Sequence, residues 1–232
     1  MDSSARILLV PTPIGNLGDL TLRGLEALKR ADRIACEDTR RSAALLAHHG
    51  ITGKRLVSLH EHNEQRRVPE LIEAARRGET IAVITDAGMP GISDPGYRLV
   101  RACIDGDVPF EVLPGASSLI TALVASGLPS HAFRFGGFLP VKSGRRRTVL
   151  ESAARSGETQ VFFESPHRLA ATLKCLADNS PETPVCVARE LTKKFETCHR
   201  GTAAELSEWF DAHPPKGEIV IVIDGSAGLD TD

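Results

Sequence analysis

The chain has 232 residues, which suits one large α/β domain or two small ones and is enough to bury a core. Its apolar content of 41% and charged content of 25% are ordinary for a globular protein. The formal net charge of −2 excludes an overall basic field of the kind that attracts nucleic acid, although it leaves a local basic patch open.

The cysteines are odd in number and far apart, and no two of them form the CxxC pair of a zinc or redox motif. Such a set is typical of free thiols in a reducing compartment. The start of the chain, "MDSSAR", has no apolar signal region, and no apolar run approaches the length of a membrane span. We therefore expect a cytoplasmic protein.

In the first half of the chain, short apolar runs alternate with helical patterns. The pattern predicts strands at 7–10, 33–36, 56–59, 80–85 and 110–113. It predicts helices at 20–30, 40–49, 68–77 and 95–105. This alternation indicates a parallel sheet with crossover helices.

The pattern changes after the turn at Pro114 and Gly115, which a helix of small residues follows. Strands are predicted near 133–138, 159–163, 185–188, 196–199 and 218–223. Only one helix, 203–210, falls among the last three, which indicates a mixed or antiparallel sheet. We expect two α/β lobes of similar size, 1–113 and 117–232, with a ligand cleft between them.

The first predicted strand leads into the turn "PTPIGNLGD", residues 11–19. It is neither a Walker A loop nor GxGxxG, and Pro11 and Pro13 lack the backbone N–H groups that cradle phosphate. One interpretation is a rigid strand-to-helix turn, capped by Asp19 or Thr21. The other is a stiff, proline-walled turn for a ligand without phosphate.

Residues 83–96, "VITDAGMPGISDPG", carry three glycines and two prolines at the end of a buried strand. Asp86 follows the strand directly, where ligands of open α/β sheets bind. Small residues there let the backbone approach a ligand closely. The composition favours a binding loop over a purely structural one.

Two further motifs, "CEDTRRS" and "SLHEHNE", also follow predicted strands and should reach the same sheet edge. They can be capped helix starts on a solvated face, since Asp38 and Thr39 are good caps. A metal site at residues 60–62 is disfavoured, because three adjacent residues do not face one ion and no HExxH is present.

The second lobe carries two basic clusters, one in "FLPVKSGRRRT" just before a predicted helix and one in "ARELTKKFETCHRG". Such clusters are either solvated faces or contacts for an anionic partner. Aromatic residues make up only 4% of the chain, so no base-stacking platform is apparent. Recognition of RNA by shape and phosphate would suit this composition better.

Taken together, these motifs resemble the tetrapyrrole methylase superfamily, the class III S-adenosylmethionine-dependent methyltransferases. The resemblance runs over nearly the whole chain. It rests on "PTPIGNLGDLTLRG", "CEDTR", "HEHNE", "DAGMPGISDPG", "PGASS", "FFESPHR" and "ELTKKFE", which stand in the family's order. Each motif alone is weak, but seven in order are a specific signal.

The resemblance implies S-adenosylmethionine as cofactor, in a cleft between two lobes and without a metal. It implies cofactor contacts from Pro13, Ile14, Thr85, Asp86, Ala87, Met89, Ser117, Ser118, Phe163, Glu164 and Thr192. Met89 stands where threonine is common in the family, and we expect the exchange to be tolerated at a backbone contact. Many relatives also continue into a helical tail beyond "GEIVIVIDG".

Within the superfamily, the motifs look most like the branch that methylates a cytidine 2′-hydroxyl of small-subunit (16S) ribosomal RNA in the decoding centre. That likeness implies the small ribosomal subunit as partner and a homodimer. RNA contacts are expected from Arg40, Lys142, Arg145, Arg146 and Arg147. The general base is expected among Glu37, Asp38, Glu61, Lys194 and Glu196.

Two alternatives stay open. One is a small-molecule methylase of the same superfamily with a porphyrin-like substrate, against which the arginine run argues. The other is an RNA- or ribosome-binding factor without catalysis. A further neighbour, diphthine synthase, acts on a protein and is less well matched.

Overall fold

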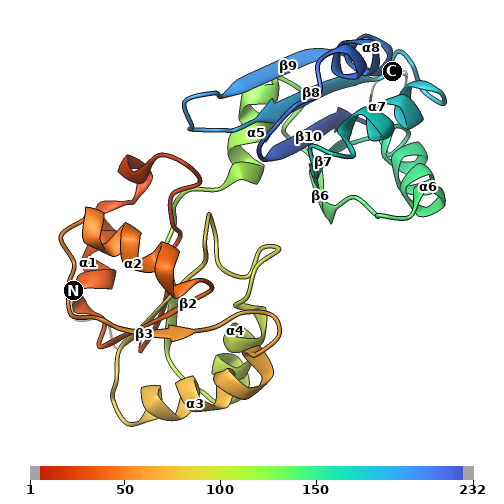
Figure 1. Cartoon of the computed structure of the whole chain (residues 1–232). Coiled ribbons are helices and arrows are strands. Elements are labelled where there is room, and N and C mark those ends of the chain that lie inside the picture. The colour runs from red at the N-terminus through yellow and green to blue at the C-terminus, as the bar shows by residue number, and fades with distance from the viewer. Residues whose placement is uncertain (1–5, 227–232) are drawn as a thin grey trace. The chain divides into compact units, whose positions relative to one another are not determined.

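The computed structural model describes residues 6–226, and the chain divides into two compact units (Figure 1). Unit 1 ends at Ser117 and unit 2 begins at Ser118. Each unit has its own five-stranded sheet with helices packed on it, so the predicted α/β class is confirmed.

Unit 1 is built on an all-parallel sheet in the order β3-β2-β4-β1-β5, as the alternation of strands and helices predicted. Its strands are β1 (Ile7–Leu9), β2 (Arg33–Cys36), β3 (Arg55–Ser58), β4 (Ile81–Ile84) and β5 (Phe110–Val112). Its helices are the 3₁₀ turn η1 (Leu17–Asp19), α1 (Leu22–Arg30), α2 (Thr39–His48), α3 (Glu64–Arg76) and α4 (Tyr97–Asp105).

Both faces of the unit 1 sheet are buried, which explains why its strands are short apolar runs without alternation. Leu8 and Val10 point to the face that α1 and α2 cover. Ile7 and Leu9 point to the opposite face, which α3 and α4 cover. The chain therefore buries every residue of β1, β2 and β4.

After the neighbouring strands β1 and β4, the chain continues toward opposite edges of the sheet. The connection after β1 runs to β2, and the connection after β4 runs to β5, on the other side of β1. Because crossovers are right-handed, the helices that follow these two strands lie on opposite faces of the sheet. The carboxyl ends of such a strand pair are the usual ligand site of an open α/β sheet.

Helices α1 and α2 of unit 1 begin after residues whose side chains accept backbone N–H groups. Thr21 caps α1 by accepting from the Gly24 N–H at 3.0 Å, while Asp19, the other expected cap, lies within η1. Asp38 caps α2 by accepting from the Arg40 N–H at 2.8 Å. Helix α3 begins at Glu64, four residues before the expected start, directly after the turn that contains Asn63.

The segment from residue 85 to 96, which we call the glycine loop, has positive φ angles at Gly88, Gly91 and Gly96. The loop closes on itself through the Gly91 N–H, which donates to the Pro95 carbonyl at 3.0 Å. At Gly96, φ is 139°, and a Cβ would lie 2.9 Å from the Gly91 nitrogen. Only glycine fits there without a backbone shift.

Unit 2 has a mixed sheet in the order β6-β7-β10-β8-β9, in which only β6 and β7 are parallel. Its strands are β6 (Phe133–Phe138), β7 (Thr159–Glu164), β8 (Pro184–Arg189), β9 (Thr197–Thr202) and β10 (Ile219–Asp224). Its helices are α5 (Ser118–Ser126), α6 (Ser143–Ala153), α7 (Leu169–Ala177) and α8 (Ala203–Ala212). The predicted mixed sheet is confirmed, while α7 was not expected.

The core of unit 2 lies between its sheet and three of its helices. Leu150 of α6, Leu173 of α7 and Phe210 of α8 cluster with Phe162 and Ile221 of the central strands. Helix α5 contacts strands β8 and β10. Across residues 6–226, no helix is both long enough and apolar enough to span a bilayer.

We expect Gly96→Ala to destabilise the protein by about 2–5 kcal/mol. A positive φ costs an L-residue about 1–2 kcal/mol. The contact with the Gly91 backbone adds an overpacking cost of about 1–3 kcal/mol. Chemical denaturation measures the loss.

The matched control is Gly78→Ala, because Gly78 has a φ of +97° but nothing within 4 Å of the point where a Cβ would lie. It should lose only the φ strain, about 1–2 kcal/mol. Equal losses in the two variants would show that the close approach at Gly96 has no energetic weight.

Candidate functional site

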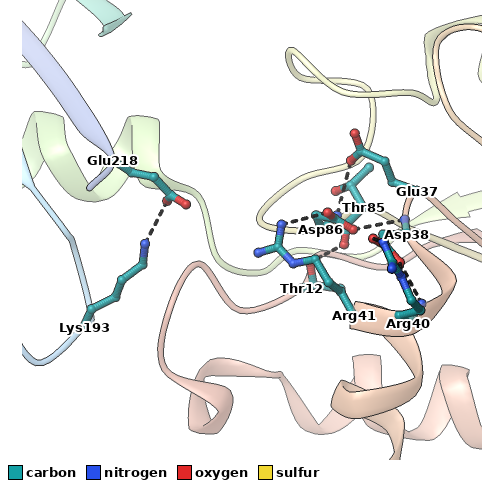
Figure 2. Close-up of polar contacts among 9 residues, drawn as sticks. All are labelled: Thr12, Glu37, Asp38, Arg40, Arg41, Thr85, Asp86, Lys193 and Glu218. Atoms are coloured by element: carbon teal, nitrogen blue, oxygen red, sulfur yellow. Dashed lines mark hydrogen bonds and ion pairs between the residues drawn. The ribbon is translucent and has the colours of Figure 1, made fainter. Parts of the chain in front are cut away.

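In unit 1, side chains from three loops meet at the carboxyl edge of the parallel sheet. Figure 2 shows Thr12 from the loop after β1, Glu37 and Asp38 from the loop after β2, and Thr85 and Asp86 from the loop after β4. The edge that sequence analysis expected to hold the ligand is therefore also where these polar groups gather.

Thr12 joins the first turn to the glycine loop. Its backbone N–H and carbonyl exchange hydrogen bonds with Gly88, both at 3.0 Å, and its hydroxyl donates to the Thr85 carbonyl at 2.9 Å. Pro13 and Ile14, which follow, are buried. The first turn is therefore a fixed part of the site rather than a freely moving connection.

Asp86 ties the glycine loop to the start of α2. Its carboxylate accepts from the Asp38 N–H at 3.1 Å and from the Arg41 guanidinium at 2.8 Å (Figure 2). Its own N–H approaches the Glu37 carboxylate at 3.5 Å. The two motifs "CEDTRRS" and "DAGMPG" thus form one polar network, as their places after β2 and β4 predicted.

Asp94, which sequence analysis did not single out, completes a group of carboxylates with Glu37 and Asp86. Burial raises the pKa of Asp94 from 3.8 to about 6, and the negative charges of Glu37 and Asp86 act in the same direction. Arg41 pairs with Asp86, and within residues 6–226 it has no second carboxylate partner. The result is an electronegative site that suits a cationic ligand.

Asp38 is committed to the helix that it caps. Hydrogen bonds from the Arg40 guanidinium and from the Arg40 N–H hold the pKa of the Asp38 carboxyl below its usual value. The guanidinium lies 3.2 Å from the carboxylate, at the solvent surface. Both residues were candidates, one as base and one for RNA, and here they pair with each other.

The motif "SLHEHNE" contributes mainly structure. Asn63 accepts from the His60 N–H at 3.0 Å and donates to the Ser58 carbonyl at 3.2 Å. The buried carboxylate of Glu64 accepts from the Gly96 N–H at 3.0 Å and so holds the end of the glycine loop. Glu61, the candidate base of this motif, is exposed.

In unit 2, the two residues expected to contact the cofactor from β7 differ in accessibility. The buried carboxylate of Glu164 accepts from the Ser165 N–H and the Thr172 hydroxyl, both at 2.7 Å, and pairs with Arg168. Phe163 is half-buried on the other face, edge-on to two further phenylalanines. The Glu164 side chain therefore stabilises the fold of unit 2 through these contacts.

The loop between β8 and β9, residues 190–196, contains three expected site residues. The carboxylate of Glu196 accepts from the Thr192 N–H. Lys194 is exposed. Glu196 thus shapes the loop around Thr192.

The basic run at residues 142–147 divides into exposed and buried members. Helix α6 begins at Ser143, so the arginines lie inside its first turns instead of before it. Arg146 is only 8% exposed and donates to the Val141 carbonyl at 3.2 Å. Lys142, Arg145 and Arg147 are exposed, whereas the expected RNA contact Arg146 does not present its side chain at the surface.

The fold and the site define the class of the protein. Residues 6–207 match the model of the tetrapyrrole (corrin/porphyrin) methylases, and the chain belongs to this family. Solved structures share the fold over nearly the whole chain. A uroporphyrin-III-C-methyltransferase from Thermus thermophilus is 24% identical, with 96% of both chains covered and a TM-score of 0.64. A diphthine synthase is 15% identical, with 94% of this chain and 89% of the other covered and a TM-score of 0.71.

More similar relatives carry a single name, Ribosomal RNA small subunit methyltransferase I. The relative from Mesorhizobium japonicum is 49% identical over 94% of this chain and 74% of its own length. The relative from Escherichia coli O157:H7 is 44% identical over all of this chain and 82% of its own length. The resemblance read from the seven motifs is confirmed.

The methyl donor of this family is S-adenosylmethionine, and the residues of unit 1 fit its chemistry. Its sulfonium and amino groups are cationic, and the carboxylates of Glu37, Asp86 and Asp94 make the sheet edge electronegative. It has no phosphate, and Pro11 and Pro13 remove two N–H groups from the turn where phosphate would bind. The expected contacts Pro13, Ile14 and residues 85–89 lie in the loops that Thr12 joins.

We expect Asp94→Asn to raise the free energy of unfolding by about 1–3 kcal/mol at pH 8, since one pKa unit corresponds to about 1.4 kcal/mol. A raised carboxyl pKa means that the native state loses stability as pH rises from about 4 to 6. The neutral amide avoids this loss. The gain should vanish below pH 4, where Asp94 is protonated in both states. Denaturation curves across pH measure it, and a gain that does not depend on pH would contradict the assignment.

Arg146→Ala should cost about 1–3 kcal/mol, because it leaves the partly buried carbonyl groups of residues 140 and 141 without this donor and removes the contacts of a buried side chain. Arg145→Ala, one position earlier and exposed, should change stability by less than about 0.5 kcal/mol. Thermal unfolding of the two variants separates the structural arginine from its neighbour. Similar losses would mean that Arg146 is not needed to hold residues 140–141.

Proposed function

We propose that this chain is an S-adenosylmethionine-dependent methyltransferase acting on small-subunit ribosomal RNA, at the ribose 2′-hydroxyl of a cytidine in the decoding centre. The observation that carries the proposal is the 44–49% identity to relatives named Ribosomal RNA small subunit methyltransferase I, over 94–100% of this chain. The finer parts of the proposal are the 2′-hydroxyl of a cytidine, a cytoplasmic location and a homodimer.

The chemistry would be a direct displacement: a hydroxyl oxygen would attack the methyl carbon in line, the carbon–sulfur bond would break, the neutral thioether would leave, and the hydroxyl proton would pass to a base or to water. The sulfonium of the cofactor, when bound, supplies an already activated methyl group. The protein then contributes mainly by positioning, which can supply up to about 7–11 kcal/mol. Thr12, Asp86 and Glu64 serve this role by fixing the loops around the sheet edge.

A general base would help to deprotonate the ribose hydroxyl, by about 10²–10⁴-fold. Of the five candidates, Asp38 is held by Arg40 and Glu196 by the Thr192 N–H, which disfavours both. Glu37, Glu61 and Lys194 remain. Asp94 joins them, because a carboxyl with a pKa of about 6 can accept a proton near neutral pH.

The proposed cofactor contacts from unit 2 remain those of the family likeness, Ser118, Phe163, Glu164 and Thr192, with Ser117 at the end of unit 1. The proposed RNA contacts are Lys142, Arg145 and Arg147, which are exposed, and Arg40, whose guanidinium also lies at the surface. Arg146 would support this surface from inside the unit.

The test is methyl transfer from labelled S-adenosylmethionine to purified small subunits that lack the modification. Naked ribosomal RNA and a porphyrin precursor are offered in parallel. We expect label in the subunit RNA, at a ribose whose linkage resists nuclease. Label in the porphyrin alone would overturn the proposal in favour of a small-molecule methylase, and cofactor binding without transfer would favour a non-catalytic factor.

The proposed RNA contacts can be tested separately through the salt dependence of RNA binding. Changing Lys142, Arg145 and Arg147 to glutamine should lower the slope of log K against log salt by about 2–3, since each phosphate contact contributes about 0.7–0.9. The matched control is Lys174→Gln, an exposed lysine on α7 beside Asp178. An unchanged slope in the triple variant would exclude these residues from the RNA contact.

A further inference from the structure

The loop between β8 and β9 is held in a strained conformation. Glu190 and Thr192 have φ angles of 52° and 65°, in the left-handed region that residues with side chains seldom adopt. Such residues persist only where the surroundings enforce them, and they concentrate at functional sites. The question is therefore what holds this loop, and what the conformation presents to solvent.

Side chains inside the loop hold its first half. The Glu190 carboxylate accepts from the Glu218 N–H and from the Lys193 ammonium, both at 2.9 Å. Lys193 also lies 3.1 Å from the Glu218 carboxylate (Figure 2). Gly217 is needed there, since a Cβ would lie 2.3 Å from the Glu190 oxygen. The charge of Lys193 is thus compensated by Glu190 in the loop and by Glu218 beside it.

Arg189, at the end of β8, holds the second half. Its guanidinium donates to the carbonyls of Phe195 and Lys216, both at 3.0 Å, and to the Thr197 hydroxyl at 3.2 Å. The backbone of Phe195 is therefore anchored to strand β8. The ring of Phe195 projects from a backbone that is fixed before any ligand binds.

At the tip of this loop, an aromatic ring and a cation lie together at the surface. Phe195 is 62% exposed, and the Lys194 ammonium lies 5.6 Å from the centre of its ring. Among residues 6–226, no carboxylate lies within ion-pairing distance of Lys194. A flat ring beside an uncompensated positive charge complements a planar, uncharged group attached to an anion.

The same observations argue against a protein partner. A contiguous apolar patch would favour a protein partner, but the chain neighbours of Phe195, Lys194 and Glu196, are exposed charged residues. Nucleotides have the required chemistry, because every base offers a flat face and every linkage a phosphate.

We propose that Phe195 stacks on an unpaired base of the RNA substrate while Lys194 contacts the adjoining phosphate. The inference rests on the proposed function, since it deepens it: the substrate would be RNA with a nucleotide unstacked near the target ribose. Single-stranded and splayed nucleotides are what proteins read on RNA by such stacking. Phe195 would then be a positioning residue for the proposed reaction, and Lys194 an RNA contact instead of a base.

The first experiment measures RNA binding and turnover of Phe195→Ala, Phe195→Leu and Phe195→Trp. Loss of one stacked base should weaken binding of small-subunit RNA about 5–100-fold in the alanine variant. The leucine variant, which stays apolar but cannot stack, should be impaired like alanine, and the tryptophan variant should be rescued. The KM for RNA should rise, while the affinity for S-adenosylmethionine stays at the wild-type value.

Salt dependence separates the two side chains. Lys194→Gln should lower the slope of log K against log salt by about 0.7–0.9, as for one phosphate contact. Phe195→Ala should weaken binding at every salt concentration and leave the slope unchanged. If both variants bind RNA as the wild type does, the proposal is wrong.

A spectroscopic signal tests stacking without relying on catalysis. The chain has one tryptophan, Trp209, so Phe195→Trp in a Trp209→Phe background reports from the loop alone. RNA should quench this fluorescence. Quenching by RNA without methyl transfer would support the stacking of residue 195 and contradict the proposed reaction. Methyl transfer that is unaffected by substitutions at residue 195 would support the reaction and contradict the stacking. If the Phe195→Ala variant differed from the wild type in its oligomeric state in solution, the ring would instead contact a second copy of the chain, and the proposal would be overturned.

Discussion

The pairing of Thr12 with the glycine loop is the constraint on which the site in unit 1 depends. Strands β1 and β4 are neighbours, but the helices that follow them lie on opposite faces of the sheet, so their loops would otherwise diverge. Three hydrogen bonds between Thr12 and the glycine loop, two donated and one accepted by Thr12, hold the two loops together. With the loops joined, Asp86 can reach the start of α2, and Glu64 can hold Gly96 from α3. Three carboxylates are thereby kept at one edge, where burial first, and then the charges of Glu37 and Asp86, raise the pKa of Asp94.

Most of the fold could be predicted from the sequence, because its elements are local patterns. Apolar runs placed all ten strands to within a few residues, and the change from alternating helices to clustered strands indicated the change from parallel to mixed sheet. The errors have local causes too. Helix α3 starts early because Asn63 orders the turn before it, a side-chain contact that periodicity does not register. Helix α6 starts inside the basic run, at Ser143, although Gly144 in its first turn disfavours a helix there.

The site was less predictable, because it depends on which side chains meet across the sheet. The motifs located the right loops, and Asp86 was placed at the right edge. The uses of individual side chains were only partly readable: Asp38 was recognised as a helix cap, whereas the sequence did not indicate that Glu164 and Glu196 accept backbone N–H groups in their own segments. In the sequence Arg146 could not be distinguished from the neighbouring arginines, but in helix α6 its side chain is buried. Asp94 had one signal, an acidic residue in a loop of glycines and prolines, which the more prominent Asp86 obscured.

The order of strands in unit 2 has a consequence for synthesis of the chain. Strand β10, Ile219–Asp224, lies between β7 and β8 and hydrogen-bonds to both, although it is the last strand of the described chain to be made. Unit 1 has all its strands once Val112 has left the ribosome, whereas unit 2 is two separate strand pairs until β10 arrives. A nascent chain therefore carries one finished unit beside an open sheet with unpaired edges, and premature termination before residue 219 would leave that sheet permanently divided.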